Sequence, residues 1–374
     1  MTVLDWLLDS DPAIRWQVKR DLLAEPEGSV MAERARVANE GWGARLLALQ
    51  DASGRWGRDA LPEGGKPAGL PDAPTRRLLR ELQGVSLEDL GSFLGIEPSV
   101  LAEWESHDPG VSDERAAKYG RALDWMWNSV GSLRPEWTST THTLVLLRDM
   151  GADPSHDRVR RAVGLVRDNV KWDHDGQDYF AGEVEPCING KTVALGAYFG
   201  ADVDGIVDRL LSEQLEDGGW NCEAERGSVR SSFHTTIEVL DGLLEYERAE
   251  GDVPEVTGAR LRAQEYLLER RMFRRRSTWE VVRDEWTQFS YPPRWHYDVL
   301  RGLDYLRKAG ADRDLRAQEA IDLVECKRQP DGRWLLENTH PGKVHFVMDE
   351  GDGRPSRWNT LRAMRVLDWW DQRA

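Results

Sequence analysis

The sequence predicts an all-α protein whose helix hairpins close into an α/α barrel. Three observations predict this fold. A short Gln–Gly–Trp pattern recurs three times in the 374 residues, an amphipathic stretch with helical spacing precedes each copy, and a polar loop with a second apolar helix follows each copy. Tryptophan is also abundant, with 17 residues, which indicates that the indole side chain is used repeatedly.

Each copy of the pattern consists of Gln, two or three residues, Gly, one residue and Trp. The preceding stretch carries apolar residues at i, i+3 and i+4, and Gly stands where a helix must end and the chain must turn. The repeating unit is therefore a helix, a Gly–Trp turn, a loop and a second helix. The three copies are Gln50-Asp-Ala-Ser-Gly54-Arg-Trp56, Gln214-Leu-Glu-Asp-Gly218-Gly-Trp220 and Gln329-Pro-Asp-Gly332-Arg-Trp334.

The spacing of the copies predicts five to six hairpins. Trp220 and Trp334 lie 114 residues apart, which accommodates two units of about 57, the one at 265–306 being degenerate at its turn. Trp56 and Trp220 lie 164 residues apart, which accommodates two units, with a degenerate one at 161–172, and leaves about fifty residues over. The first 40 residues add another helical pair. Since each pair buries its apolar faces only against its neighbours, such an array closes into a barrel.

Composition and charge exclude several classes of protein. The chain has 50 basic and 66 acidic side chains, and its net charge of −16 argues against nucleic-acid binding by the whole surface. The sequence contains no run of about 18 apolar residues, so no membrane span is expected. Its N-terminal segment lacks the features of a signal peptide. We therefore expect a cytoplasmic protein in which Cys187, Cys222 and Cys326 are reduced thiols.

The Gln–Gly–Trp turns resemble the QW repeats of squalene and oxidosqualene cyclases, and the repeated hairpins resemble the α/α toroid shared with protein prenyltransferase β subunits. The resemblance covers residues 1–57 and 130–374. It implies a toroid that binds an apolar, isoprenoid-like molecule in a central cavity, with zinc-assisted transferase or cyclase chemistry. The sequence contains neither the Asp-x-Asp-Asp nor the Asp-Asp-x-x-Asp motif of the two terpene cyclase classes. Whether the chain is an enzyme therefore stays open.

Aromatic and polar side chains cluster before the second helix of each hairpin, and we expect them to line the central cavity. Aromatic walls suit apolar or cationic ligands. The alternative is that these rings simply fill the interior of a small toroid. The predicted cavity residues are Trp137, His142, Tyr179, Phe233, Trp295, His296, Tyr297, Trp358 and Asn359.

Two loop-to-helix junctions, one repeat apart, carry a candidate metal site. Successive junctions of a toroid meet at one mouth of its cavity, and carboxylate, thiolate and imidazole groups around an open position are a plausible zinc set. The alternative is a buried thiol at a helix start and a capping or core histidine. A later segment with two histidines, 340–345, is interpreted as a solvated loop. The candidate zinc ligands are Glu185, Cys187, Cys222 and His234.

This set resembles the Asp-x-Cys…His zinc site of prenyltransferase β subunits. The resemblance implies that Glu185 replaces the aspartate, that Cys187 and His234 match the other two ligands, and that Cys222 adds a fourth. The family binds its prenyl diphosphate with basic residues shortly before this motif. This chain has an acidic stretch there, at 178–183, which would repel a diphosphate.

The surplus residues predict a small helical insertion. Residues 58–74 are rich in proline and glycine, the composition of a linker. Beyond them, Ser86 is a candidate N-cap for a helix that Gly95 ends, and Pro98 opens the next helix. This pattern resembles the helix-turn-helix fold of Cro/XRE-type repressors. The expected segments are 1–57 for the first part of the toroid, 58–74 for the linker, 75–128 for the insertion and 129–374 for the rest of the toroid.

The insertion leaves two hypotheses open. The helix expected at 97–105, at the place of a recognition helix, carries three glutamates and no Arg, Lys, Asn or Gln that reads base edges. Any DNA contact falls to the phosphates, through Arg76, Arg77 and Arg80. One hypothesis is a ligand-sensing transcriptional regulator that binds DNA in this way. The other is a degenerate module that contacts protein or acts as an interaction scaffold.

Overall fold

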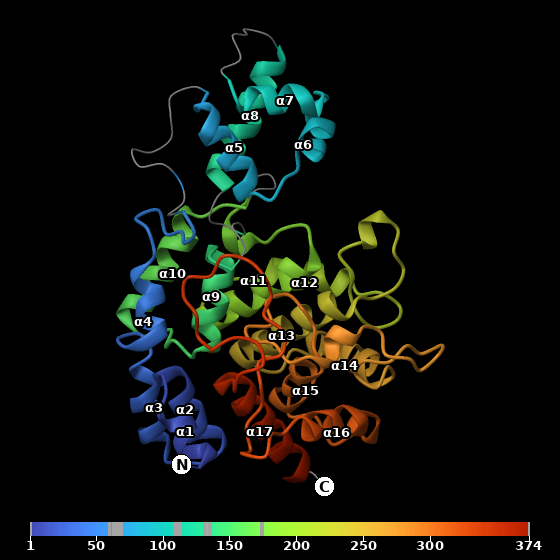
Figure 1. Cartoon of the computed structure of the whole chain (residues 1–374). Helices are drawn as coiled ribbons and strands as arrows, with labels where there is room; N and C mark the ends of the chain where they lie inside the picture. Colours follow the sequence, from blue (N-terminus) through green and yellow to red (C-terminus); the bar gives the residue numbers. More distant parts are fainter. Residues whose placement is uncertain are drawn as a thin grey trace.

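Helices arranged as a ring dominate the computed structural model, which describes residues 2–58, 61, 70–107, 114–129, 133, 137–172 and 176–372 (Figure 1). Apart from three isolated β-bridges, the regular elements of these residues are α-helices and short 3-10 helices. The prediction of an all-α toroid is confirmed. None of the described helices is both long and apolar enough to cross a membrane.

The inner wall of the ring consists, within the described residues, of six helices that follow one another along the chain. Neighbouring members pack side by side, and α17 packs against α2, which closes the ring near the two chain ends (Figure 1). Trp16 and Gln17 of α2 donate to carbonyls at the end of α9, at 2.8 and 3.1 Å. The inner helices are α2 (Pro12–Asp21), α9 (Thr140–Asp149), α11 (Pro186–Phe199), α13 (Phe233–Glu250), α15 (Val299–Lys308) and α17 (Arg357–Gln372).

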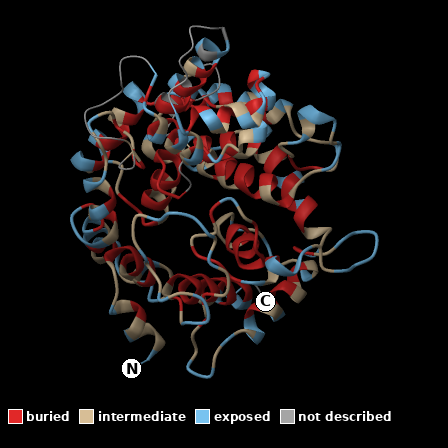
Figure 2. Ribbon diagram, turned by 45° about the horizontal axis from the view of Figure 1, so that its top comes forward, coloured by how far each residue is buried: buried red, intermediate tan, exposed pale blue. Residues whose placement is uncertain are grey.

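A second layer of helices covers the outside of this wall. The outer helix α10 is amphipathic and buries only the stripe of Val159, Ala162, Val163 and Val166. The inner helix α11, in contrast, is buried on nearly all sides. Figure 2 shows the buried residues gathered on the packed helices and the exposed residues on the outer turns. The outer helices are α1 (Val3–Leu8), α3 (Glu27–Ala35), α4 (Gly41–Ala48), α10 (Asp157–Asn169), α12 (Asp204–Ser212), α14 (Pro254–Leu268) and α16 (Gln318–Cys326), and the 3-10 helices are η1 (Tyr179–Ala181), η2 (Ala224–Arg226), η3 (Asp284–Thr287) and η4 (Leu315–Ala317).

The three Gln–Gly–Trp turns occupy equivalent places, each between an outer helix and the next inner helix. Trp56, Trp220 and Trp334 are fully buried, and each indole N–H donates at 2.7 Å to the carbonyl ten residues earlier. The backbone N–H of each Trp donates to a threonine hydroxyl in the first turn of the next inner helix, at 3.0 to 3.2 Å. Each turn therefore joins the end of one helix to the start of its partner, as the repeat predicts.

In two of these turns the Gln side chain also joins neighbouring hairpins. Gln50 donates to Ala162 of α10 at 2.9 Å, and Gln214 donates to Ala259 of α14 at 2.8 Å. The glycines of these two turns have φ of +83° and +96°, and a Cβ there would lie 2.6 Å from backbone atoms of the same neighbouring helix. Glycine is required both for the backbone conformation and for the close approach. The third turn differs, because Gln329 donates to a carbonyl two residues earlier.

Four helices between α4 and α9 form a group with a hydrophobic core of its own, at the top of Figure 1. Ser86 accepts the Asp89 N–H at 3.0 Å, and Gly95 ends the same helix with a φ of +67°, as the sequence predicts. Most of the predicted linker 58–74 lies outside the described residues. The helix-turn-helix resemblance and the domain boundaries stay predictions. The four helices are α5 (Ala73–Leu82), α6 (Leu87–Leu94), α7 (Pro98–Trp104) and α8 (Glu114–Ser129).

Candidate functional site

The loops that lead into two neighbouring inner helices bring a carboxylate and two thiols together. Glu185 stands directly before α11, Cys187 lies in its first turn, and Cys222 lies in the loop that leads to α13. From α9 onward, inner and outer helices alternate along the chain, so these leading loops meet at the same mouth of the ring. The ligand atoms of the three residues all lie within 4.8 Å of one another. Three of the four predicted zinc ligands therefore converge.

A hydrogen bond between the two thiols shifts their pKa values in opposite directions. The hydrogen bond with Cys222 raises the pKa of Cys187, and burial raises it further. The same hydrogen bond lowers the pKa of Cys222, although burial opposes this effect. The Glu185 carboxylate, 3.4 Å from the Cys187 sulfur, is a second acceptor within reach of the single Cys187 proton. Cys222 is therefore the sulfur that ionises first, and Cys187 retains its proton.

His234, the fourth predicted ligand, lines the same cavity but lies outside this group of ligand atoms. Its Nδ1 accepts the backbone N–H of Tyr297 at 2.8 Å, which leaves the proton of the neutral ring on Nε2. Burial lowers the pKa of His234 to about 4, and the charges of His296 and Arg301 act in the same direction. The predicted group of four ligands is therefore corrected to three, with His234 a neutral residue of the cavity wall.

The three converging residues form one side of a mainly apolar cavity of about 400 Å³, called here the thiol cavity. Its apolar walls include Trp137, Ile188 and Trp295. Trp137 has a φ of +67°, an unfavourable conformation for a bulky residue, and its indole N–H donates to a backbone carbonyl of the 340–345 loop at 2.5 Å. A mostly apolar cavity with a few convergent polar groups is typical of a small-molecule site.

The loop 340–345 contacts this mouth through its two histidines, while residues 341–344 are exposed, so its interpretation as a solvated loop holds for its middle part. The His340 ring stacks on His296 with centroids 3.7 Å apart, and His345 shares a 2.8 Å hydrogen bond with Thr143 of α9. A Cβ on Gly342 would lie 2.5 Å from the Trp137 indole nitrogen. The contacts to α9 and to Trp137 join residues more than 200 positions apart, and no local sequence signal predicts them.

The nine residues predicted to line a single aromatic cavity divide among different environments. Trp137, His142 and Trp295 line the thiol cavity, and His142 and Trp358 line a second, larger cavity. His296 lies in a stack of rings between Trp295 and His340. The prediction is wrong for the remaining four, which lie in the packed core at no more than 5% exposure: Tyr179, Phe233, Tyr297 and Asn359.

The core contacts of these four residues explain the difference. Tyr179 stacks on Trp172 and donates to the Thr141 hydroxyl at 2.9 Å. Phe233 packs against three aromatic rings, and the Tyr297 hydroxyl donates to a backbone carbonyl at 2.6 Å. The Asn359 amide donates to two backbone carbonyls at 3.0 and 3.1 Å. Their place before or at the start of an inner helix was predictable, but whether each side chain points between helices or into the ring depends on packing.

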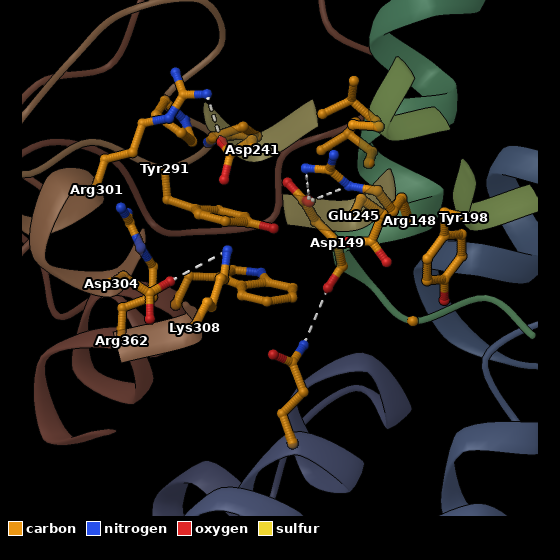
Figure 3. A pocket seen from close by; sticks show the side chains of 18 of the residues that line it. Arg148, Asp149, Tyr198, Asp241, Glu245, Tyr291, Arg301, Asp304, Lys308 and Arg362 are labelled. Atoms are coloured by element: carbon orange, nitrogen blue, oxygen red, sulfur yellow. Dashed lines mark hydrogen bonds and ion pairs between the residues drawn. The ribbon is translucent and has the colours of Figure 1, made fainter. Parts of the chain in front are cut away.

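The larger cavity, of about 530 Å³, is lined mainly by charged side chains of the inner helices and is called here the charged cavity (Figure 3). It corrects the prediction that the central cavity has an aromatic lining. On α13 its lining includes Glu238, Asp241 and Glu245, and on α15 it includes Arg301 and Asp304. Sequence reasoning missed these residues, although their spacing of three or four positions inside otherwise apolar helices was a usable signal.

A buried group of ions lies where the two cavities meet. Lys191 lines both cavities, and its Nζ lies 2.8 Å from the Glu238 carboxylate. Arg301 lies 3.0 Å from Glu238 and 3.0 Å from Asp241. Burial by itself raises the pKa of Glu238, but the Arg301 and Lys191 cations outweigh burial and lower it to about 2. Glu238 therefore stays ionised at neutral pH and compensates two buried cations.

The arginines predicted to contact DNA are largely used inside the insertion. Arg76 is 1% exposed, and its guanidinium donates to three backbone carbonyls at 2.6 to 3.0 Å. Arg80 forms a two-point ion pair with Glu105 at 2.6 and 2.8 Å. The predicted phosphate contact is therefore wrong for Arg76 and Arg80, because the fold itself uses their donors. It stays a prediction for Arg77, which is exposed and pairs with Glu81 one turn away.

Comparison with known proteins identifies no family: no family model and no curated protein matches the sequence. Among solved structures, a protein from Actinoplanes is similar at 14% identity over 91% of this chain and 99% of its own, with a TM-score of 0.33. The type II terpene cyclase MstE from Scytonema, in complex with geranylgeranyl dihydroxybenzoate, is similar at 14% identity over 91% of this chain and 96% of its own, with a TM-score of 0.31. Similarity at this level assigns no activity to the chain.

Proposed function

We propose that the toroid is a zinc-dependent protein that binds an apolar, isoprenoid-like molecule in the thiol cavity and supports transferase or cyclase chemistry there. The observation that carries this proposal is the convergence of Glu185, Cys187 and Cys222 at the wall of a mainly apolar cavity. Thiolate and carboxylate groups are zinc ligands, and three protein ligands leave one position open, as in catalytic zinc sites.

The charges and acidities of this group fit a zinc ion. Metal binding displaces thiol protons, and Cys222, whose pKa is lowered by its hydrogen bond with Cys187, gives up its proton more readily than Cys187. Cys187, whose pKa is raised by its hydrogen bond with Cys222 and by burial, would lose its proton only on binding the metal. A bound zinc ion supplies a Lewis acid that lowers the pKa of a water or thiol at its open position.

Other residues of the cavity bind and orient the ligand. The ring faces of Trp137 and Trp295 offer apolar contact area. His234 is neutral above its pKa of about 4, so it adds no charge to this apolar wall. Lys191 is the cation nearest the boundary with the charged cavity, and its pairing with Glu238 keeps its ammonium group in place.

The metal proposal is tested by the zinc content of the purified protein. We expect about one zinc per chain, measured by mass spectrometry of the metal, and a loss of most of it in Cys187→Ser and in Cys222→Ser. Cys326→Ser is the matched control, because Cys326 is exposed and lies outside the group. Cobalt in place of zinc should show a sulfur-to-metal charge-transfer band in the wild type that either cavity variant weakens. A wild type that takes up no zinc from a zinc-loaded chelator would overturn the proposal.

The ligand proposal is tested with farnesol as the probe. Binding should quench tryptophan fluorescence saturably, and Trp295→Ser should weaken it at least about tenfold, since it removes one ring wall of the cavity. Trp279→Ser is the matched control, because Trp279 is also about half exposed and does not line either cavity. Equal farnesol affinity of both variants would contradict binding in the thiol cavity.

A protein contact through the insertion is the second candidate function. Phe93 on α6 is 82% exposed, and a large exposed ring on a small helical module is typical of a contact surface. DNA binding has less support, because two of the three predicted arginines are used internally. An electrophoretic mobility assay at low salt separates the two: we expect no shift of duplex DNA by the wild type.

A further inference from the structure

The charged cavity has an excess of cations that the proposed function does not use. It is lined by side chains along the inner helices and by residues 291–294 of the loop before α15, whereas the thiol cavity is lined mostly by the first turns of inner helices and the loops before them. Among the described residues of its lining, eleven side chains are basic and six are acidic, although the whole chain has a net charge of −16. Positive charge is therefore concentrated in the interior of an acidic protein.

Each acidic side chain of the cavity forms an ion pair with a basic side chain that also lines the cavity. Glu238 is shared by Lys191 and Arg301, and Asp304 lies 2.7 Å from Arg365. The remaining four acidic side chains each have a basic nitrogen within 3.5 Å. Some acids are shared by several cations, as Asp304 is by Arg307, Lys308 and Arg365, so the lining keeps a net positive charge.

Arg294 is a clear member of this surplus. Its residue is 8% exposed, and its guanidinium makes no hydrogen bond or ion pair with any described residue. The group stacks over the Trp137 ring, 4.9 Å from the centroid. Burial lowers the pKa of Arg294 to about 10, which leaves it charged at neutral pH. A buried cation without a counter-ion is costly, and an anionic ligand would remove that cost.

Two neutral donors in the same cavity wall also lack partners. The Tyr291 hydroxyl and the Trp358 indole N–H are both buried and make no hydrogen bond within the described residues. Their rings stack with centroids 4.3 Å apart, and the Tyr291 hydroxyl points into the cavity in Figure 3. An indole N–H is a donor only, so its missing partner is an acceptor. Buried polar groups are rarely left unpaired unless a ligand, an ion or water completes them.

We propose that the charged cavity binds a small organic phosphate or diphosphate, with the Arg294 guanidinium, the Tyr291 hydroxyl and the Trp358 indole N–H as its unfilled donors. Phosphate oxygens accept several hydrogen bonds at once and match the guanidinium group. A surplus of five cations in the lining exceeds what one carboxylate neutralises. The volume of about 530 Å³ leaves room for an organic part beside the anion.

The proposal is tested by titrating the full chain with pyrophosphate at constant ionic strength. We expect calorimetry to show saturable binding of pyrophosphate and weaker binding of inorganic phosphate. Titration with chloride, as a nonspecific anion, should give no binding heat above that of dilution into buffer. Arg294→Met keeps the apolar stem and removes the charge, and it should weaken pyrophosphate binding at least about tenfold. Arg226→Met is the matched control, because Arg226 is exposed and lies outside the cavity. Binding unchanged by Arg294→Met would overturn the proposal.

Tyr291→Phe provides a second variant in case Arg294→Met unfolds. It removes only the unpaired hydroxyl, so the ligand-free protein should keep its melting temperature while its pyrophosphate affinity falls severalfold. Equal pyrophosphate affinity of Tyr291→Phe and the wild type would contradict the role of this donor. Tighter binding of citrate than of pyrophosphate would replace the phosphate class with a polycarboxylate.

The zinc proposal and this one fail independently. Pyrophosphate also chelates zinc, so the titration is repeated with Cys187→Ser, which should bind pyrophosphate as the wild type does. Loss of binding in Cys187→Ser would place the anion at the metal and overturn the assignment to the charged cavity. A zinc-free wild type that still binds pyrophosphate would overturn the proposed function alone.

Discussion

The two ends of the inner helices carry different chemistry, and the thiol cavity and the charged cavity are the result. The first turns and their leading loops place a carboxylate and two thiols at one mouth. The last turns of α9, α13 and α15 carry basic residues instead, among them Arg148, Arg248 and Lys308. Because the inner helices run in the same direction, their dipoles point the same way. The dipole favours cations at the C-terminal ends, whereas Arg301, in the first turn of α15, is compensated by Glu238 and Asp241 instead.

This difference teaches how a ring of parallel helices separates two kinds of site. An inner helix is covered by neighbours on nearly all sides, so its polar residues face either another inner helix or the central space. The helix dipole then favours opposite charges at the two ends. Glu238 and Lys191 lie where the two sites meet and keep the boundary compensated in charge.

The largest expected effect comes from breaking this boundary. Glu238→Ala leaves Lys191 and Arg301 buried, with Lys191 lacking any other carboxylate partner among the described residues. Removing one partner of a buried ion pair costs about 3–5 kcal/mol of unfolding free energy. Urea unfolding followed by circular dichroism measures this loss. Glu223→Ala, which removes an exposed partner of Arg226, should leave the midpoint nearly unchanged. Equal midpoints for the two variants would show that the boundary is not held by charge pairing.

Lowering the pH should reduce folding stability through the histidines at the mouth of the ring before it protonates the acids of the charged cavity. Burial lowers the pKa of His234, His296 and His340 to about 4 in the folded protein, below their ordinary value of 6.5. The unfolded chain therefore binds more protons between these values, and stability present above pH 6.5 is lost as the pH falls toward 4. At pH 5 each histidine accounts for at most about 2 kcal/mol. Glu238, with a pKa of about 2, stays charged throughout this window.

Urea midpoints at pH 7, 6 and 5 measure this effect. His296→Asn should flatten the dependence, because it removes one of the three groups that take up a proton on unfolding. His107→Asn, a change in the insertion, serves as the control for replacing a histidine outside the mouth. A stability that stays constant from pH 7 to pH 5 would contradict the burial of the histidines at the mouth.

The smallest expected effect concerns the order in which the thiols react. In metal-free protein, Cys222 should be alkylated by iodoacetamide at a lower pH than Cys187, because their shared hydrogen bond lowers the pKa of one and raises that of the other. Cys187→Ala removes this hydrogen bond and should slow Cys222 alkylation severalfold at pH 7.5. Peptide mass spectrometry distinguishes the sites, and the exposed Cys326 serves as the internal reference. Faster reaction of Cys187 would reverse the assigned order.

Local signals in the sequence were sufficient for the helices and their turns. Trp56, Trp220 and Trp334 end in equivalent places because a glycine that allows positive φ and an indole that needs burial act within one turn of chain. The N-cap of α6 at Ser86 and its C-cap at Gly95 were also predictable, because both depend on residues within one turn of the helix end. Convergence of Glu185, Cys187 and Cys222 was also predictable, since the repeat places successive leading loops at one mouth.

Residues whose partners are distant in the chain were predicted poorly. Arginine is usually exposed, but the fold buries Arg76, and its guanidinium donates to three backbone carbonyls. Tyr179 and Asn359 carry the aromatic and polar character of cavity residues, yet both point into the core. The 340–345 loop is polar and contains glycine, yet its two histidines contact the mouth.

The sequence alone determined the hairpin repeat, the closed all-α ring and the thiol group, because helical period, caps and turn glycines act over a few residues. Tertiary structure alone decided which side chains face the central space and that this space is charged. Arg301 pairs with Glu238, 63 residues away in the sequence, and Arg365 pairs with Asp304, 61 residues away. Such pairs form only when tertiary packing brings the two helices together, and a helical period does not specify which of several buried faces a residue occupies.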